Sequence, residues 1–285
     1  MKVKFTGGLI SVLLTAAILM AIIAAGCGSS ESSSQARRQI KRFQDLASPG
    51  VKIAIGDPEL APVGKYTVAV LENIGEKDGD LKQKIDKNIV TREPNVRAIL
   101  DKVVNREVDA GFVYITDAMI EKDRICVIEI PEEVQVVSEY PVCVLKESDN
   151  KPLAEVFFKY VLARQGQEVL KKYGFVPAVK DPAYFKPGNF QGQTLVVFAA
   201  ASLTNAFFEM GKSFEQKTGV KVKFQFGASG TLRQKIEGGA VGGEGGADVF
   251  AAAGMKDAEI LREKGLSGDM APFVKNKLVV ITPKN

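Results

Sequence analysis

Short apolar runs alternate with amphipathic stretches along the chain from about residue 50 onward. The run VKIAI, Val51 to Ile55, is followed by a turn and then by a helical pattern that begins near Lys65. Asn95 stands where a helix cap is expected, and apolar positions between residues 96 and 103 repeat at helical spacing. The run AGFVY ends at Tyr114 and leads into a further short helix. Strands that alternate with helices in this way predict an α/β fold.

The second part of the chain repeats this alternation after a break. An amphipathic stretch from Pro152 onward predicts one long helix that is closed by Gly174. Pro and Gly residues between Val176 and Gln193 indicate a linker, after which strand and helix patterns alternate from TLVVFA to the last strand, KLVVITP. We therefore expect two lobes, each a mostly parallel sheet flanked by helices. The glycine-rich segment Gly238 to Ala247 lacks the strand-to-helix setting of a phosphate-binding loop and predicts a flexible loop.

The first 27 residues differ from the rest of the chain. Lys2 and Lys4 precede an apolar run that ends in Ala24-Ala25-Gly26-Cys27, which is typical of a secretory signal peptide. A membrane-spanning helix is the alternative, but the run is shorter than such a helix needs. A cysteine directly after Ala-Gly resembles the lipobox of bacterial lipoproteins. We expect residues 1–27 to be a signal peptide with lipidation at Cys27, residues 28–37 to be a tether, and the mature protein to lie outside the cytoplasm on a lipid anchor.

Charge and composition exclude several classes of protein. The formal net charge is +4, and removal of the two lysines of the signal leaves +2, too little to indicate a nucleic-acid partner. The basic run from Arg37 to Arg42 suits either anionic lipid headgroups or a solvated helix face. The sequence contains no histidine, so it lacks the usual metal ligand and the commonest general base. This absence weighs against an enzyme.

Two cysteines remain after Cys27. Cys126 and Cys143 lie on short apolar segments that resemble strands. In an oxidising compartment they could form a disulfide. They could equally be two small hydrophobic residues on different strands, and their spacing does not decide between these interpretations.

Several strand-to-helix turns carry small or hydroxyl residues. Ser202 follows a strand in FAAASLTNAFF, and Ser229 lies between small residues in GASGTL. Further helix starts occur near Val63 and Val96. Backbone amides at helix starts, helped by hydroxyl groups, can replace the water shell of a tetrahedral oxyanion. Each of these turns taken alone is also compatible with an ordinary helix cap.

Taken together, the motifs resemble those of the periplasmic molybdate-binding proteins of ABC transporters, in the type II periplasmic-binding-protein superfamily. The matching segments are FAAASL, GASGTL, ADVF, NKLV, GDPE with PVG, NVR, GFVY, YPV and KYGF. They extend over almost all of residues 38–175 and 194–284. The resemblance implies two lobes with a ligand cleft between them, hinge closure on the anion, no catalytic residues and no cofactor. It also implies an ABC permease and its ATPase as partners of a monomeric binding protein.

The same resemblance assigns roles to five residues. It implies anion-binding hydroxyl groups on Ser202 and Ser229, backbone amides at Val63 and Val96, and the phenol of Tyr114. Molybdenum or tungsten would be present only inside the bound oxyanion, without direct protein ligands. Without the resemblance, Tyr114 would be interpreted as a core tyrosine. The sequence does not discriminate molybdate from tungstate.

The order of the motifs departs from that family and indicates a circular permutation. Relatives begin with the FAAASL segment and end with KYGF, whereas this chain passes from KYGF through residues 176–193 into FAAASL. On this interpretation residues 38–141 with 279–285 correspond to the family's second lobe, and residues 142–278 to its first lobe. Exposed loops are the sites where new chain ends are best tolerated.

Three alternatives remain at this point. The ligand could be sulfate or another tetrahedral oxyanion. The chain could be a secreted serine hydrolase that uses Ser202 or Ser229, although neither lies in a GxSxG motif and no histidine is present. It could also be a surface lipoprotein that no longer binds a ligand.

Overall fold

The computed structural model describes residues 40–243 and 245–284. The predicted signal peptide of residues 1–27, the lipidation site at Cys27 and the tether of residues 28–37 lie outside the described residues. Among the described residues, no helix combines the length and the apolar character that a membrane crossing requires.

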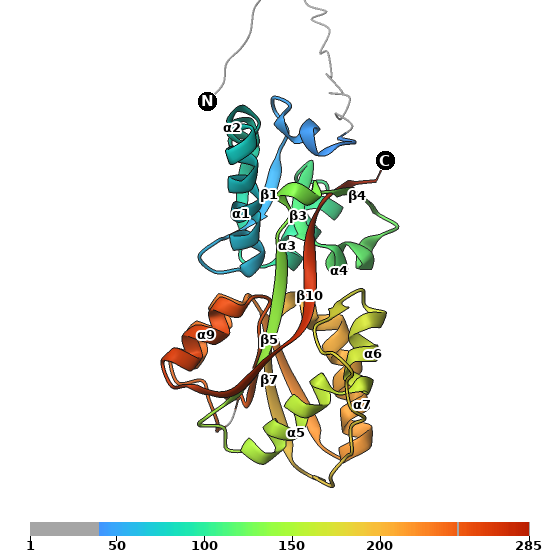
Figure 1. The fold of residues 1–285 in the computed structure, drawn as a ribbon, viewed down its shortest axis with the longest axis vertical. Coiled ribbons are helices and arrows are strands. Elements are labelled where there is room, and N and C mark those ends of the chain that lie inside the picture. The colour runs from blue at the N-terminus through green and yellow to red at the C-terminus, as the bar shows by residue number, and fades with distance from the viewer. Residues whose placement is uncertain (1–39, 244, 285) are drawn as a thin grey trace, which may run out of the picture. The chain divides into compact units, whose positions relative to one another are not determined.

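The first lobe consists of residues 40–136 and the carboxyl end of the last strand (Figure 1). Its strands are β1 (Ile53–Gly56), β2 (Ile89–Glu93), β3 (Ala110–Tyr114) and β4 (Ile125–Glu129). Its helices are α1 (Pro62–Lys77), α2 (Gly79–Asn88), α3 (Val96–Val104) and α4 (Ile115–Ala118), with the short 3-10 helices η1 (Phe43–Ala47), η2 (Met119–Glu121) and η3 (Glu132–Val134). β1 pairs in parallel with both β2 and β3.

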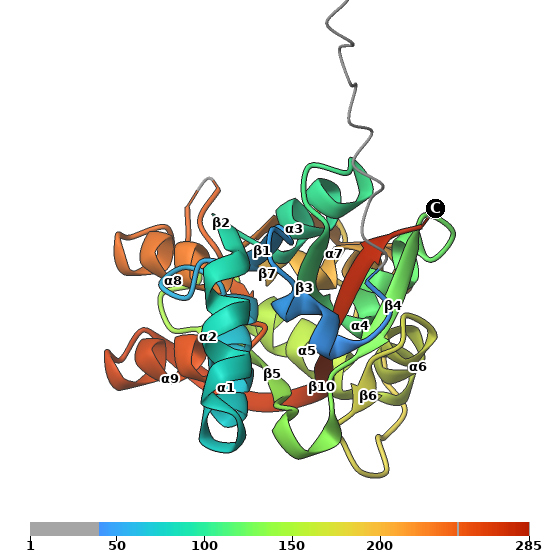
Figure 2. The same cartoon turned by 90° about the horizontal axis from the view of Figure 1, so that it is seen from above.

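The second lobe consists of residues 137–277. Its strands are β5 (Val137–Leu145), β6 (Val176–Pro177), β7 (Thr194–Ala200), β8 (Lys221–Gly227), β9 (Val249–Ala251) and the first part of β10 (Ser267–Pro283). Its helices are α5 (Lys151–Leu162), α6 (Arg164–Lys172), the 3-10 helix η4 (Ala201–Leu203), α7 (Thr204–Thr218), α8 (Ser229–Glu237) and α9 (Met255–Glu263). Strand β7 pairs in parallel with β8 and β9. Helices α8 and α9 lie side by side (Figure 2).

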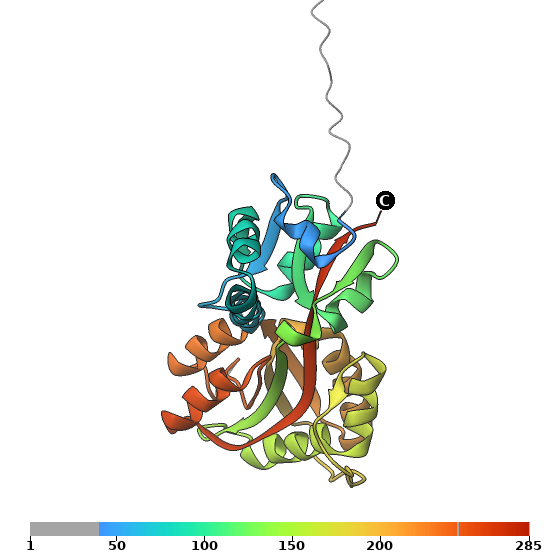
Figure 3. The same cartoon turned by 45° about the horizontal axis from the view of Figure 1, so that its top comes forward.

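Strand β10 joins the two lobes (Figure 3). Residues 267–277 of β10 pair with β5, and residues 278–283 pair with β3 and β4. The sequence predicted only the KLVVITP end of this strand. Its earlier part contains Pro272 and polar residues, and the pairing with β5 shifts register between Pro272 and Val274, which accommodates a residue without an N–H.

The α/β class is confirmed, and the sheet is open, with strand order β2-β1-β3-β10-β5-β9-β7-β8. The pairing is mixed rather than mostly parallel, because β10 runs antiparallel to every strand that it pairs with, and β5 runs antiparallel to β9. Gln39–Asn285 pack as one compact unit, so the packing does not fix a boundary between the two lobes. The predicted lobe boundaries at 141/142 and 278/279 therefore stay predictions.

The prediction of one long helix ending at Gly174 is wrong, because the helix breaks at Ala163 into α5 and α6. Ala163 has an extended backbone, with φ −76° and ψ 163°. A Cβ atom on Gly166 would lie only 2.3 Å from the carbonyl oxygen of Tyr160, so the chain turns tightly against the end of α5. The freed amide of Arg164 donates to the carbonyl of Ala183, in the predicted linker.

The two cysteines of the described residues are both free. Cys126 is exposed on β4, and Cys143 is buried on β5 in the other lobe. Burial raises the pKa of the Cys143 thiol to about 12. The disulfide interpretation is therefore wrong, and Cys143 is a small residue of the core.

Candidate functional site

A small cavity of about 20 Å³ lies between the two lobes. The residues that line it are Ala61, Pro62, Val63, Asn95, Val96, Tyr114, Ala200, Ala201, Ser202, Gly227, Ala228, Ser229 and Ala253. The structure thus brings together all five residues that the sequence singled out: Val63, Val96 and Tyr114 from the first lobe, and Ser202 and Ser229 from the second. None of the lining residues carries a charged side chain.

Two helices of the first lobe begin at the cavity. Helix α1 starts at Pro62, after Ala61 in an extended conformation. Helix α3 starts at Val96, and the Asn95 side chain accepts hydrogen bonds from the amides of Arg97 (3.0 Å) and Ala98 (3.2 Å). The cap therefore satisfies the second and third amides of α3. The first amide, on Val96, is left at the cavity for a ligand.

In the second lobe, two neighbouring parallel strands end at the cavity. Ala200 at the end of β7 is in register with Gly227 at the end of β8. Ser202 and Ser229 come directly after these strand ends, in η4 and at the start of α8. The carboxyl ends of parallel strands are where α/β sheets place their ligands. Adjacent pairing of β7 and β8 is therefore what places the two serines at one site.

Partner groups orient both hydroxyls. The amide of Ala253 donates to Oγ of Ser229 at 3.0 Å, which leaves the Ser229 proton free for another acceptor. Oγ of Ser202 lies 3.1 Å from Oη of Tyr140, and that phenol also accepts from Nδ2 of Asn276 at 3.3 Å. Because Tyr140 accepts from Asn276, its own proton can go to Ser202. Ser202 can then donate its proton into the cavity.

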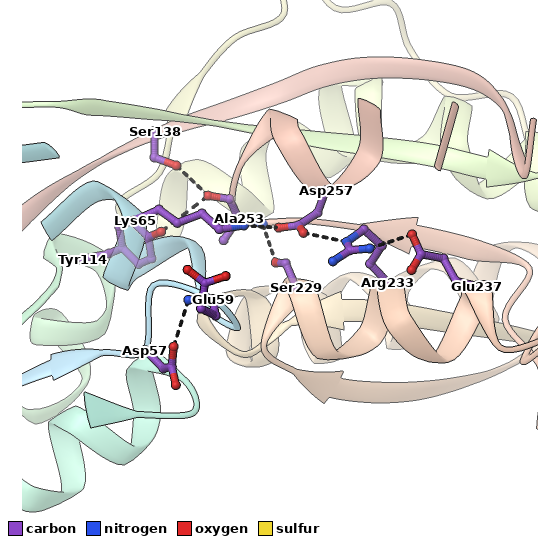
Figure 4. Close-up of polar contacts among 10 residues, drawn as sticks. All are labelled: Asp57, Glu59, Lys65, Tyr114, Ser138, Ser229, Arg233, Glu237, Ala253 and Asp257. Atoms are coloured by element: carbon purple, nitrogen blue, oxygen red, sulfur yellow. Dashed lines mark hydrogen bonds and ion pairs between the residues drawn. The ribbon is translucent and has the colours of Figure 1, made fainter. Parts of the chain in front are cut away.

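Tyr114 completes the lining as a neutral donor. It is fully buried, and burial raises its pKa well above the usual value of a tyrosine. Its Oη lies 3.4 Å from the carbonyl oxygen of Ala253, and Oγ of Ser138 donates to the same carbonyl at 2.6 Å (Figure 4). Because Ser138 already satisfies that carbonyl, Tyr114 can turn its proton to a ligand without leaving a buried acceptor unpaired.

Three supporting residues were missed by the sequence analysis. Tyr140 and Asn276 stand behind Ser202, and Ser138 stands behind Tyr114. The first two lie in the quoted segments YPV and NKLV, so the motif pattern contained a signal for them. Ser138 had no such signal, because its role depends on Ala253, far along the chain.

The serines lack the surroundings of a catalytic nucleophile. Ser229 accepts from a backbone amide, Ser202 meets a phenol, and the sequence contains no histidine to act as a base. Across the described part of the chain, no group of His, Cys, Asp or Glu residues is arranged to hold a metal ion. The cavity is therefore suited to hydrogen bonding from neutral groups.

The comparisons with known proteins agree with a binding site. Residues 21–176 and 195–285 match the family described as bacterial extracellular solute-binding protein. The chain is 31% identical over 138 residues to the molybdate-binding protein ModA of Mycobacterium tuberculosis, and this match covers 48% of this chain and 49% of that protein. It is 34% identical over 126 residues to ModA of Escherichia coli, and this match covers 44% of this chain and 46% of that protein. The chain thus spans about half the length of the curated relatives it matches.

Among solved structures, a phosphate-binding protein of a phosphate ABC transporter from Streptococcus pneumoniae superposes with a TM-score of 0.49 and 13% identity, over 82% of this chain and 89% of the other.

Proposed function

This chain belongs to the family of bacterial extracellular solute-binding proteins, and we propose that its solute is a tetrahedral oxyanion, molybdate or tungstate, captured for an ABC importer. Members of this family bind a solute and do not convert it. The expectation that the chain is not an enzyme is therefore confirmed, and the serine hydrolase alternative is excluded. The family also places the protein outside the cytoplasm.

The observation that carries the proposal is the composition of the cavity. Its lining combines two helix starts, two serine hydroxyls and one phenol from both lobes, without a charged side chain. Neutral N–H and O–H donors can replace the hydration of a doubly charged tetrahedron on all sides. A cavity of about 20 Å³ also suits a single small ion and is too small for an amino acid or a sugar.

The relatives support the choice of anion. The two proteins from M. tuberculosis and E. coli are named for molybdate binding, at 31% and 34% identity. Tungstate has the same shape and nearly the same size, so the proposal includes both. Sulfate is smaller and would not reach every donor of a cavity built for the larger anions.

The permuted order of segments is part of the proposal. The family match leaves out residues 177–194, which overlap the predicted linker of residues 176–193. A comparison that follows chain order can align only one side of a permutation point, and each relative is matched over about half its length. Both observations support a permuted chain.

The proposed mechanism is hinge closure. Strand β10 passes from one lobe into the other, and the chain enters β5 from the first lobe beside it, so these two crossings are the places that can flex as the lobes part. In the open form the anion would first meet one lobe, and closure would complete its shell of donors. The closed, monomeric protein would then be presented to the permease and its ATPase by the lipid anchor on Cys27.

The melting temperature of the full chain carrying Cys27→Ser tests this function directly. Molybdate or tungstate at ~100 times the dissociation constant adds ~2.7 kcal/mol to the folded state, a rise of roughly 5–10 °C for a chain of this size. Sulfate and phosphate at the same concentration are the controls. Selective stabilisation by sulfate would favour the alternative oxyanion receptor. No shift with any of the four anions would contradict the proposal.

A further inference from the structure

Each first-lobe helix that begins at the cavity carries a cation near its start that reaches the second lobe. Nζ of Lys65, on α1, lies 3.7 Å from Oδ2 of Asp257 on α9 (Figure 4). Nη2 of Arg97, on α3, lies 3.4 Å from Oδ1 of Asn205 on α7. We call these two contacts, Lys65 with Asp257 and Arg97 with Asn205, the inter-lobe clasps. Lys65 follows Val63 by two residues and Arg97 directly follows Val96, so each clasp is attached to a helix start that faces the cavity.

The acceptor of the first clasp is held in place by its own lobe. The Asp257 side chain is 1% exposed, and Nε of Arg233, on the neighbouring helix α8, lies 3.0 Å from its Oδ1. Arg233 in turn pairs with Glu237, which also meets Lys264. Asp257 therefore keeps a cation when the lobes part, and Lys65 is the partner that closure adds.

The second clasp uses a neutral acceptor. Nε of Arg97 lies 2.9 Å from Oδ1 of Asp117, a fully buried carboxylate of the same lobe. The charge of Arg97 is therefore matched inside the first lobe, and another nitrogen of the guanidinium is left for the Asn205 amide oxygen. This clasp should depend little on ionic strength, whereas the Lys65 clasp joins two full charges.

A close backbone approach lies on the same side as the Lys65 clasp. The amide of Gly230, in the first turn of α8, donates to the carbonyl of Leu60 in the first lobe at 3.0 Å. A Cβ atom on Gly230 would lie 2.6 Å from that oxygen, so a larger residue would hold the lobes apart. The lobes thus meet tightly beside Lys65.

We infer that Lys65 and Arg97 are positioning residues that hold the lobes closed and thereby set how long a bound anion stays. The inference rests on the proposed function, because it assumes that an anion occupies the cavity. Both contacts join opposite lobes, so they form only when the lobes close. Their loss should speed release of the anion and leave the rate of capture by the open form unchanged.

The test compares three variants of the full chain in release of labelled molybdate after addition of excess unlabelled molybdate. Lys65→Gln removes the first clasp, and Asn205→Ala removes the second without unpairing the buried Asp117. Lys264→Gln is the matched control, because it removes one positive charge from the same cluster within a single lobe.

Lys65→Gln should release molybdate roughly 5-fold faster at low salt, with a smaller effect at high salt. Asn205→Ala should give roughly 2-fold faster release at any salt concentration.

Release rates of Lys65→Gln and Asn205→Ala equal to those of the wild type would overturn the inference. Equal acceleration by Lys65→Gln and Lys264→Gln would also overturn it, because the effect would then come from net charge alone.

A second measurement separates failure of the inference from failure of the proposed function. If the wild type binds no oxyanion, the proposed function fails, but the distance between lobes can still be measured without a ligand. Spin labels on the exposed Cys126 and on Gln216→Cys, in a Cys27→Ser background, report on the two lobes. Lys65→Gln should shift the distances toward longer values relative to the wild type and Lys264→Gln. Identical distributions would overturn the clasps independently of any anion.

Discussion

The two lobes meet the same cavity with different chemical groups. The first lobe brings helix starts at Val63 and Val96, whose side chains are apolar and whose useful groups are backbone amides. The second lobe brings the side-chain hydroxyls of Ser202 and Ser229, each oriented by a partner behind it. Tyr114 adds a side-chain hydroxyl from the first lobe. Substitutions should therefore act differently in the two lobes: loss of a side chain should matter in the second, and loss of an N–H should matter in the first.

The largest effect is expected from the second-lobe serines. Ser229→Ala or Ser202→Ala removes a hydrogen bond to a charged ligand, worth ~1.5–3 kcal/mol. The dissociation constant for molybdate, measured by titration calorimetry, should rise roughly 10- to 100-fold in each variant. Ser213→Ala, a serine of α7 that does not line the cavity, is the control. Unchanged affinity in both cavity variants would remove these hydroxyls from the site.

The next largest effect is expected from the backbone of the first lobe. Val96→Pro removes the N–H and leaves the backbone conformation in place, because proline fits the first position of a helix and Asn95 already has the extended conformation that proline requires of its predecessor, with φ −159° and ψ 169°. Affinity should fall roughly 10-fold. Val96→Ala keeps the N–H and should change affinity by less than ~3-fold. If both variants weaken binding equally, the contact is made by the side chain and the contrast between the lobes is lost.

The lobes also differ in how they hold a buried carboxylate near the cavity. Asp257 in the second lobe has two cationic partners, Arg233 and Lys65. Asp117 in the first lobe has Arg97, and burial outweighs that attraction and raises the pKa of Asp117 from 3.8 to about 6. The folded state therefore binds an extra proton between these two pKa values. Stability contributed by this group falls as pH rises from about 4 to about 6.

Replacement of Asp117 by asparagine should remove that pH dependence. Relative to Asp117→Asn, the wild type should gain on the order of 2 kcal/mol of unfolding free energy when the pH falls from 7 to 4. Urea unfolding of both proteins across this range measures the difference. A difference that is constant with pH would mean that Asp117 stays charged throughout.

The smallest effect is expected at the cysteines, one in each lobe. Cys126 is exposed in the first lobe and Cys143 is buried in the second. In a Cys27→Ser background, the folded protein should react with one equivalent of a thiol reagent and the unfolded protein with two. Cys126→Ser should leave the melting temperature unchanged. A lower melting temperature and no reactive thiol in the folded parent protein would point to a disulfide instead.

Much of the site was predictable because its parts are local. Helix starts at Val63 and Val96 follow from Pro62 and from the Asn95 cap, which act on residues one to three positions away. The serines follow strand ends, and the motif resemblance assigned them a common role. The sequence did not predict the residues that support these donor groups. Ser138 supports Tyr114 only through the carbonyl of Ala253, which lies 115 positions further along the chain.

The fold, like the site, was predictable where it depends on local sequence and was not predictable where it depends on tertiary contacts. Apolar periodicity predicted most strands and helices, but it did not predict the break at Ala163, because the stretch on both sides is amphipathic and good for helix formation. The break depends on Gly166 packing against the carbonyl of Tyr160 and on Ala183, which accepts from the freed amide of Arg164. The early part of β10 was also missed, because only its pairing with β5 makes a polar segment with a proline into a strand.

By itself, the sequence determined the α/β class, the two helix starts at the cavity and five of the residues that line it, because these depend on neighbouring positions or on short motifs. Only the tertiary structure decided which cations cross between the lobes. Lys65 meets Asp257 and Arg97 meets Asn205 because β5 and β10 bring the two lobes together. No local pattern specifies a pairing between residues so far apart in the chain.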